Sequence, residues 1–354
     1  MTQQITNKRI LKIALPMVIS NATIPILGAT DTGVIGQLGD PGLLASVGVG
    51  AITISVIYWI FGFLRMGTTG LVAQARGSGD QSEVFSSLIR GVLIGFSAGI
   101  TLLLLQIPLF WLALNLFQAL PEVEAQAQTY LEIRIWSAPL SISNFAVLGW
   151  LIALEKTGYV LFLQVLMNCL NIILDLIFVL YLGWGIEGVA FASLIAELSG
   201  AFLAVIIVIK LYRKSGYPII SNLFSKLQWN KLFITNVNIL IRSILLEVVI
   251  LSYVFFGSTL GTITLATNHI LLQFVHISSY SLDGFAFSAE TLVGSAYGQK
   301  SQSQIRAAAI KSTLWAVFCA IFMTLLLLTF GEKVIGMMVR DEAVLHSAQK
   351  YLFW

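Results

Sequence analysis

The heptapeptide LVAQARG at residues 71–77 has a similar counterpart, LVGSAYG at residues 292–298, which lies 221 positions further along the chain. The same offset relates identical or similar residues on both sides of these segments. The related pairs are Gly36 and Gly257, Leu44-Ala45 and Leu265-Ala266, Arg90 and Lys311, and Gln128-x-Tyr130-Leu131 and Gln349-x-Tyr351-Leu352. Single identities between apolar segments arise by chance, but one constant offset over 95 positions indicates an internal repeat. The sequence therefore predicts two structurally related halves.

The composition predicts that both halves lie in a membrane. Hydrophobic residues make up 57% of the 354 residues and charged residues only 10%, whereas soluble domains hold about 25% charged residues. One soluble core could not bury so much apolar surface, so we exclude soluble enzymes and nucleic-acid-binding proteins. Cys169 and Cys319 both lie in apolar runs and form neither a disulfide framework nor a metal-binding spacing.

Nine apolar runs are long enough to cross a bilayer as helices. They cover approximately residues 10–36, 43–66, 84–107, 125–152, 158–182, 187–209, 231–256, 261–290 and 304–330. A tenth run begins near residue 342 and continues to Trp354. We predict an all-α polytopic membrane protein. Because two repeats of 221 residues would need about 442 residues, we expect a truncated form of a twelve-span protein, with a protein of nine or ten spans as the alternative.

Basic residues mark one side of this membrane protein. Of the 20 Lys and Arg residues, 15 fall at the N-terminus or in connections on the same side. They are Lys8, Arg9, Lys12, Arg65, Arg76, Arg90, Lys156, Lys210, Arg213, Lys214, Lys226, Lys231, Lys300, Arg306 and Lys311. Cytoplasmic loops carry an excess of such residues, so we predict a cytoplasmic N-terminus in a cell (cytoplasmic or inner) membrane, with the first span retained as a helix.

The domain organisation follows from the repeat. Six spans, an even number, separate its two copies, so the repeat is parallel and relates two lobes about an axis normal to the membrane. We expect an N-terminal lobe at residues 1–212 with spans one to six. A cytoplasmic linker at 213–230 with Pro218 follows, and then an incomplete C-terminal lobe at 231–354.

Charged residues inside the spans are the candidates for function. Two bases, Arg134 and Arg242, lie clearly within spans. Six acids do so: Asp31, Asp175, Glu197, Glu247, Asp283 and Glu290. A charge inside the bilayer is costly, so these acids must be protonated, paired, or bound to a cation.

Three of the polar residues lie at similar depth in the outer half of the first lobe. Counted at about 1.5 Å per residue, they are Asp31, Asp175 and Ser193. Asn168 and Asn171 share one helix face with Asp175, because the three recur at i, i+3 and i+7. This stripe either lines a polar cavity or forms hydrogen bonds between helices.

Other polar residues in the spans allow more than one interpretation. Asp283 and Glu290 share a helix face, and with Glu247 they form a candidate polar site in the second lobe or contacts within it. Arg242 could neutralise Glu247 or the acids of the next span. Glu197 is expected to be a structural hydrogen-bond partner. His269 and His276 occur without an H-E-x-x-H motif, so we predict no metal site.

Several segments resemble the DNA-damage-inducible F (DinF) branch of the multidrug and toxic compound extrusion (MATE) transporters. The segments are ALPMVISNATIPILGATDTGVIGQLG (14–39), FLRMGTTGLVAQARG (63–77), LNIILDL (170–176), GVAFASLIAE (188–197) and LDGFAFSAETLVGSAYG (282–298). The resemblance covers essentially the whole chain. It implies a MATE-like two-lobe bundle of twelve helices, of which this chain lacks spans eleven and twelve and most of ten.

The resemblance also implies roles for individual residues. In proton-coupled relatives the acid of the first span is the central coupling residue, and Asp31 matches it. Asn171 and Asp175 match the polar pair of span five, and Ser193 matches the small hydroxyl of span six. Pro25 matches a proline associated with bending of the first helix. No catalytic residue, enzymatic activity or cofactor is implied, apart from H⁺ or Na⁺ as the coupling ion.

We therefore expect export of organic, often cationic or amphipathic, compounds by proton-coupled antiport with alternating access. Sodium coupling and flipping of lipid-linked precursors are alternatives, although flipping would need several cations in the cavity. A non-transporting membrane partner is the alternative of another class. An intramembrane enzyme is disfavoured because the polar groups are isolated acids. The expected partners are small organic substrates, the coupling ion and the bilayer, and not nucleic acid.

Overall fold

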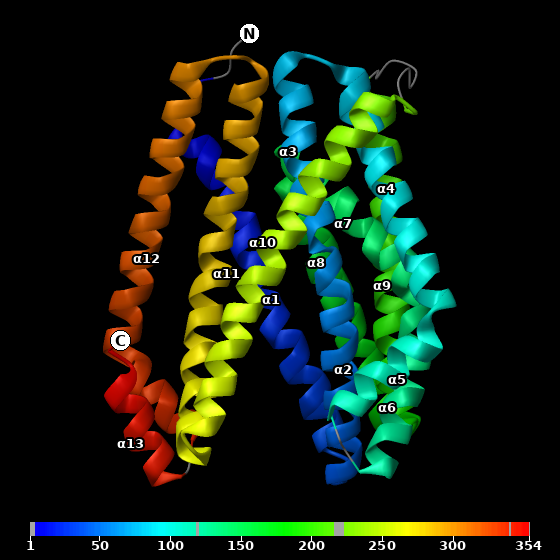
Figure 1. Ribbon diagram of the computed structural model, residues 1–354, viewed down its shortest axis with the longest axis vertical. Coiled ribbons are helices and arrows are strands. Elements are labelled where there is room, and N and C mark those ends of the chain that lie inside the picture. Colours follow the sequence, from blue (N-terminus) through cyan, green and yellow to red (C-terminus); the bar gives the residue numbers. More distant parts are fainter. Residues whose placement is uncertain (1–3, 118–119, 216–222, 340, 354) are drawn as a thin grey trace.

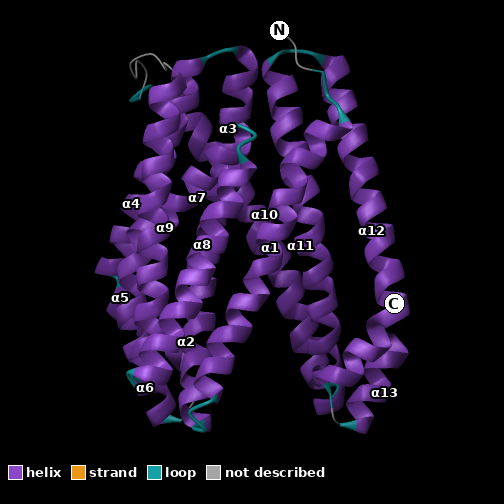
Figure 2. Cartoon of the chain, turned by 180° about the vertical axis from the view of Figure 1, so that it is seen from behind, coloured by secondary structure: helices purple, strands orange, loops and turns teal. Residues whose placement is uncertain are grey.

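The computed structural model describes residues 4–117, 120–215, 223–339 and 341–353, and the secondary structure in these ranges is helical (Figures 1 and 2). The helices of the first half are α1 (Asn7–Gly36), α2 (Pro41–Trp59), α3 (Phe63–Ser78), α4 (Gln81–Leu104), α5 (Gln106–Phe117), α6 (Pro121–Arg134), α7 (Ala138–Ala153), α8 (Thr157–Asp175) and α9 (Gly185–Ser215). Those of the second half are α10 (Lys226–Thr259), α11 (Thr262–Gly298), α12 (Gln302–Met338) and α13 (Glu342–Tyr351).

Each predicted span coincides with one helix or with two helices joined by a short turn. Single 3₁₀ turns join α2 to α3 (Ile60–Gly62) and α6 to α7 (Ile135–Ser137), and a π-helical turn at Leu176–Tyr181 extends α8. Among the described residues, seven segments are long and apolar enough to cross a membrane. The predicted spans at α1 and α11 are not among these seven, although the two helices have 30 and 37 residues.

The repeat predicted from the sequence extends to the helix boundaries. Helices that begin 221 residues apart are α2 and α11 (Pro41 and Thr262), α4 and α12 (Gln81 and Gln302), and α6 and α13 (Pro121 and Glu342). Two pairs depart from the pattern. Helices α11 and α12 are continuous, whereas the matching segments of the first half are divided into α2 and α3 and into α4 and α5. The separate helix α5 was not predicted.

Helices α3 and α11 cross closely through residues that the repeat makes equivalent. A Cβ atom on Gly77 would overlap the carbonyl of Ser295, and a Cβ on Gly298 would overlap the carbonyl of Gln74. With an offset of 221, Gly77 corresponds to Gly298 and Gln74 to Ser295, so each contact is the counterpart of the other. Such reciprocity is expected at a local two-fold axis.

Helix α1 connects the two groups of helices. Its first half packs Ile10, Ile13 and Ala14 against Phe285 and Leu292 of α11, and α1 also contacts α8 and α2 of its own half. In Figures 1 and 2 the two groups lie closest near the N-terminus and farther apart at the opposite end, which holds α6 and α13. The position of α1 lets one helix contact residues of both halves.

Candidate functional site

Four of the predicted residues form one cluster where α1, α8 and α9 meet. In the orientation that satisfies its neighbours, the Asn171 amide nitrogen donates to Asp31 Oδ1 at 3.1 Å and to Asp175 Oδ2 at 3.2 Å. The Asn171 oxygen then accepts from the Ser193 backbone N–H at 3.2 Å and from the Ser193 hydroxyl at 3.1 Å. One amide therefore connects two carboxyl groups on different helices to a third helix.

The two carboxyl groups of the cluster are held near each other by this amide, because its nitrogen lies within hydrogen-bonding distance of an oxygen of each. Asp175 is fully buried, and its Oδ1 has no hydrogen-bond partner among the described residues, whereas Asp31 is partly exposed. An ionised carboxylate only accepts hydrogen bonds, so a hydrogen bond between two carboxyl groups requires a proton on one of them. The arrangement can therefore hold a proton shared between Asp31 and Asp175.

Asn168 and Pro25 lie near this cluster but outside it. Asn168 Nδ2 donates to Thr23 Oγ1 at 2.8 Å and to the Thr23 carbonyl at 3.3 Å, which links α8 to α1. For the stripe of polar residues on α8 we predicted either a cavity lining or hydrogen bonds between helices, and Asn168 forms such a hydrogen bond. Its partner, Thr23, was not predicted. Pro25 lies between Thr23 and Asp31, where α1 stays helical.

An ion pair lies beside the cluster. Arg134 Nη2 is 2.7 Å from Glu197 Oε1, and the Ser141 hydroxyl donates to Glu197 Oε2 at 2.8 Å. Glu197 therefore has the structural partners that were expected for it. The positive charge of Arg134 also acts on Asp31 and Asp175, so this residue stabilises negative charge in the cluster.

The structure brings together two of the three second-lobe acids. Asp283 and Glu290 both interact electrostatically with Arg65 of α3, and the Arg65 guanidinium lies 4.6 Å from the centroid of the Phe287 ring. Arg242 also acts on Glu290. Among the described residues, no ion pair joins Arg242 to Glu247.

Two assignments from the sequence, and one motif in it, need correction or comment. Arg65 and Arg90 were counted as loop bases, but Arg65 lies within the segment Pro41–Ser78 and Arg90 is buried in α4, where it pairs with Glu83. The segment GFSAG at 95–99 matches the G-x-S-x-G pattern, but it lies inside α4 rather than at a strand-to-helix turn. Residues 216–222 of the predicted linker, with Pro218, lie outside the described residues.

A cavity of about 1120 Å³ lies between α10, α11, α12 and α13. Asp283 lines it, together with Asn268, Thr267, Phe274 and Tyr253. A cavity of this size with apolar, hydroxyl and acidic groups is suited to a small organic molecule.

Comparisons with known proteins agree with this architecture. Residues 16–177 and 239–354 match the family described as MatE. The chain belongs to the MatE family. It is 35% identical to DNA damage-inducible protein F of Escherichia coli (strain K12) over 99% of its own length and 76% of that protein. It is 28% identical to the probable multidrug resistance protein NorM of Rhizobium meliloti (strain 1021), over 92% of this chain and 71% of that one.

Solved structures of MATE transporters share the fold. One is described as the outward-facing conformation of a multidrug resistance MATE family transporter of the MOP superfamily, and another as MATE in the straight conformation. Each has a TM-score of 0.88 and 18% identity, and the match covers 98% of this chain and 78% of the other. The chain is thus a multi-pass membrane protein of a transporter family rather than an enzyme. The match confirms the predicted all-α bundle.

Proposed function

We propose that this MatE-family chain exports organic compounds by proton-coupled antiport, with Asp31 and Asp175 as the proton-binding pair. The observation that carries the proposal is the Asn171 amide, whose nitrogen donates to an oxygen of each carboxyl group. Sodium ions prefer sites built from oxygen atoms alone, as hard cations do in general. An N–H group between the two carboxyl groups therefore favours a shared proton over Na⁺.

The contacts of α1 suggest how a proton would affect transport. α1 contacts Asn171 of α8 through Asp31, and it packs on α11 of the second lobe through Ile10, Ile13 and Ala14. Protonation of Asp31 removes a charge from this contact, so the outer part of α1 is free to bend near Pro25. A bend that narrows the pocket would expel the substrate and couple the two binding events.

The predicted lobes (residues 1–212 and 231–354, with the linker at 213–230) and the cytoplasmic N-terminus belong to the same proposal. The basic residues at the end where the two helix groups approach each other support the cytoplasmic assignment of that end. The arrangement then corresponds to an outward-open state. The cavity that contains Asp283 suits cationic or amphipathic substrates, because a carboxyl group pairs with a cationic headgroup. Flipping of lipid-linked anions is less favoured, since Arg134 already pairs with Glu197.

Transport by the reconstituted chain tests the proposal. Proteoliposomes with an imposed pH gradient and ethidium as the substrate should show antiport, and Asp31→Asn or Asp175→Asn should reduce its rate at least tenfold. Asp40→Asn is the matched control, because Asp40 only caps α2 and Asn caps equally well. Undiminished transport by Asp31→Asn, or transport driven by a Na⁺ gradient alone, would contradict the proposal. Thermal stabilisation by ethidium without transport would favour a non-transporting partner.

A further inference from the structure

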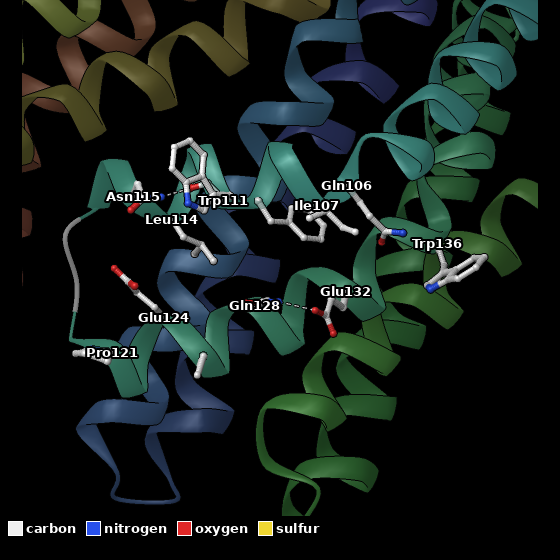
Figure 3. Close-up of a pocket in the computed structure, with 12 residues that line it drawn as sticks. Gln106, Ile107, Trp111, Leu114, Asn115, Pro121, Glu124, Gln128, Glu132 and Trp136 are labelled. Atoms are coloured by element: carbon white, nitrogen blue, oxygen red, sulfur yellow. Dashed lines mark hydrogen bonds between the residues drawn. The ribbon is translucent and has the colours of Figure 1, made fainter.

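A groove of about 810 Å³ lies between α5 and α6, away from the coupling cluster (Figure 3). It exists because the third span of the first half breaks. Proline at position 108 clashes with the carbonyl of residue 104, and α4 ends at Leu104. The residue at the equivalent position in the second half is Thr329, and α12 continues through it. The break separates α5 from α4 and leaves α5 facing α6.

Each helix presents a distinct face to the groove. Helix α5 buries Phe110 and Leu114 in the core and leaves Ile107 and Trp111 exposed at 81% and 69%. Helix α6 contributes Glu124, Gln128 and Glu132, spaced four apart, to the lining of the groove. Trp136, in the 3₁₀ turn that follows α6, lies at one end of the groove (Figure 3). The α5 side of the groove is mostly apolar, with Gln106 and Asn115 as its polar residues, and the α6 side carries the two acids.

The charge of this lining points to a positively charged ligand. Its twelve residues, all described, include two carboxylates and no Lys or Arg. Gln128 Nε2 donates to Glu132 Oε1 at 2.7 Å and so fixes the orientation of that carboxylate. Carboxylates bind an ammonium group through charge-assisted hydrogen bonds, and the indole ring of Trp111 offers a face for the adjoining carbon atoms.

The internal repeat shows that the fold does not require these acids. At the offset of 221, Glu124 corresponds to Leu345 and Glu132 to Phe353. The second copy therefore has apolar residues at both positions, Leu345 within the equivalent helix α13 and Phe353 two residues after its end. The helix can therefore form without these two acids. Because they line a groove in the first copy alone, we infer that they serve to bind a ligand rather than to stabilise the fold.

The position of the groove identifies the source of the ligand. The segment Pro121–Ala153 has 33 residues, or about 50 Å of helix against about 30 Å of hydrocarbon. Its first turns, with Glu124, therefore extend into the headgroup region, where Trp side chains such as Trp111 are typical. Leu104 and Leu105, exposed at 78% and 52%, continue the apolar surface from the inner end of the groove. They provide a surface along which acyl chains can lie.

We propose that the α5–α6 groove binds phosphatidylethanolamine, with its primary ammonium group at Glu124 and its acyl chains along Ile107, Leu104 and Leu105. The ammonium group donates to the carboxylate of Glu124, and Glu132, about 12 Å further along the same helix, adds negative charge to the groove. This inference stands independently of the transport mechanism, because the groove contains no residue of the coupling cluster.

Lipid titrations followed by native mass spectrometry test the proposal on the purified full chain. Phosphatidylethanolamine should bind about tenfold more tightly than phosphatidylglycerol, since it gains charge-assisted hydrogen bonds. The double variant Glu124→Leu/Glu132→Phe, which carries the residues of the second copy, should lose this preference. Glu124→Gln/Glu132→Gln provides a second variant of nearly unchanged shape. The control is Glu122→Gln, on the same helix but outside the groove lining, and it should keep the preference.

Several results would overturn the proposal. Among them are an unchanged preference in both double variants, an equal loss in Glu122→Gln, and displacement of the lipid by ethidium. Phosphatidylcholine, which lacks N–H donors, should bind clearly more weakly than phosphatidylethanolamine, and equal binding would also refute the assignment. Unchanged helix content and unchanged unfolding midpoint without lipid show that any loss arises in the groove rather than from misfolding.

Discussion

The reciprocal contact between α3 and α11 makes a sharp prediction about additivity. In Gly77→Ala the new Cβ would overlap the carbonyl of Ser295, and in Gly298→Ala it would overlap the carbonyl of Gln74. In both variants the new Cβ would lie much closer to the carbonyl than the 3.0 Å that Cβ atoms keep from other heavy atoms. Because the obstacle is backbone in each case, α3 and α11 must move apart by about 1 Å, as in overpacked cores.

The expected size follows from the cost of overpacking. A methyl group forced into a close contact destabilises by about 1–3 kcal/mol. At about 2 °C per kcal/mol for a chain of this size, each substitution should lower the unfolding midpoint by about 2–6 °C. Once the helices have separated to admit one methyl group, the symmetric contact is relieved as well. The double variant Gly77→Ala/Gly298→Ala should therefore lose much less than the sum of the single losses.

Thermal unfolding in detergent, followed by tryptophan fluorescence, measures these effects. Gly48→Ala is the control, because a Cβ at Gly48 in α2 would meet no atom within 4 Å. It should be neutral or stabilising by up to about 1 kcal/mol through helix propensity. Strictly additive losses at Gly77 and Gly298 would refute the reciprocal geometry, and so would two single variants that behave like Gly48→Ala.

Two further predictions concern ion pairs. Arg134→Gln should destabilise by about 3 kcal/mol, because Glu197 loses its partner in a mostly buried site, and Glu197→Gln on that background should recover part of the unfolding midpoint. Burial would raise the pKa of Glu155, but hydrogen bonds and charge from Arg9 and Arg76 outweigh burial and lower it below the ordinary 4.5. Since the folded-state pKa is depressed, this stabilisation is present above about pH 4.5 and is lost as the pH falls through the folded value. Midpoints measured from pH 6 to pH 3 should fall more steeply for the wild type than for Glu155→Gln, and equal slopes would contradict the assignment.

Features fixed by the bilayer could be predicted from the sequence. The length of a span and the sign of its flanking charges follow from membrane thickness and topology, so the nine predicted spans coincide with helices. Depth along the spans also sufficed to group Asp31, Asp175 and Ser193, because residues at one depth on adjacent helices can meet. The cluster around Asn171 agrees with that grouping.

Features that depend on helix rotation could not be predicted. Asn168 shares a helix face with Asn171, yet a small rotation directs its amide to Thr23 of α1. Arg65 was assigned to a loop because it stands at the edge of an apolar run, while in the structure its charge meets Asp283 and Glu290 across the two helix groups. The break before α5 had a signal in Pro108, but nothing in the sequence states on which side α5 packs.

The charged residues break the symmetry that the repeat imposes on the backbone. Arg65, Asp283 and Glu290 form one cluster between the halves, and Asp31 lies in the first half alone. Their counterparts at the offset of 221 are Ala286, Gly62, Thr69 and Ser252, all of them uncharged. A symmetric pair of acids would respond to protonation equally in both lobes and would favour neither direction of opening. An acid present in one lobe only changes the energy of one interface, and a two-state transporter needs such a difference for an ion to shift its conformational equilibrium. The repeated backbone thus allows the two halves to move relative to each other. The charged residues that are present in one half only couple this movement to ion binding, as we propose.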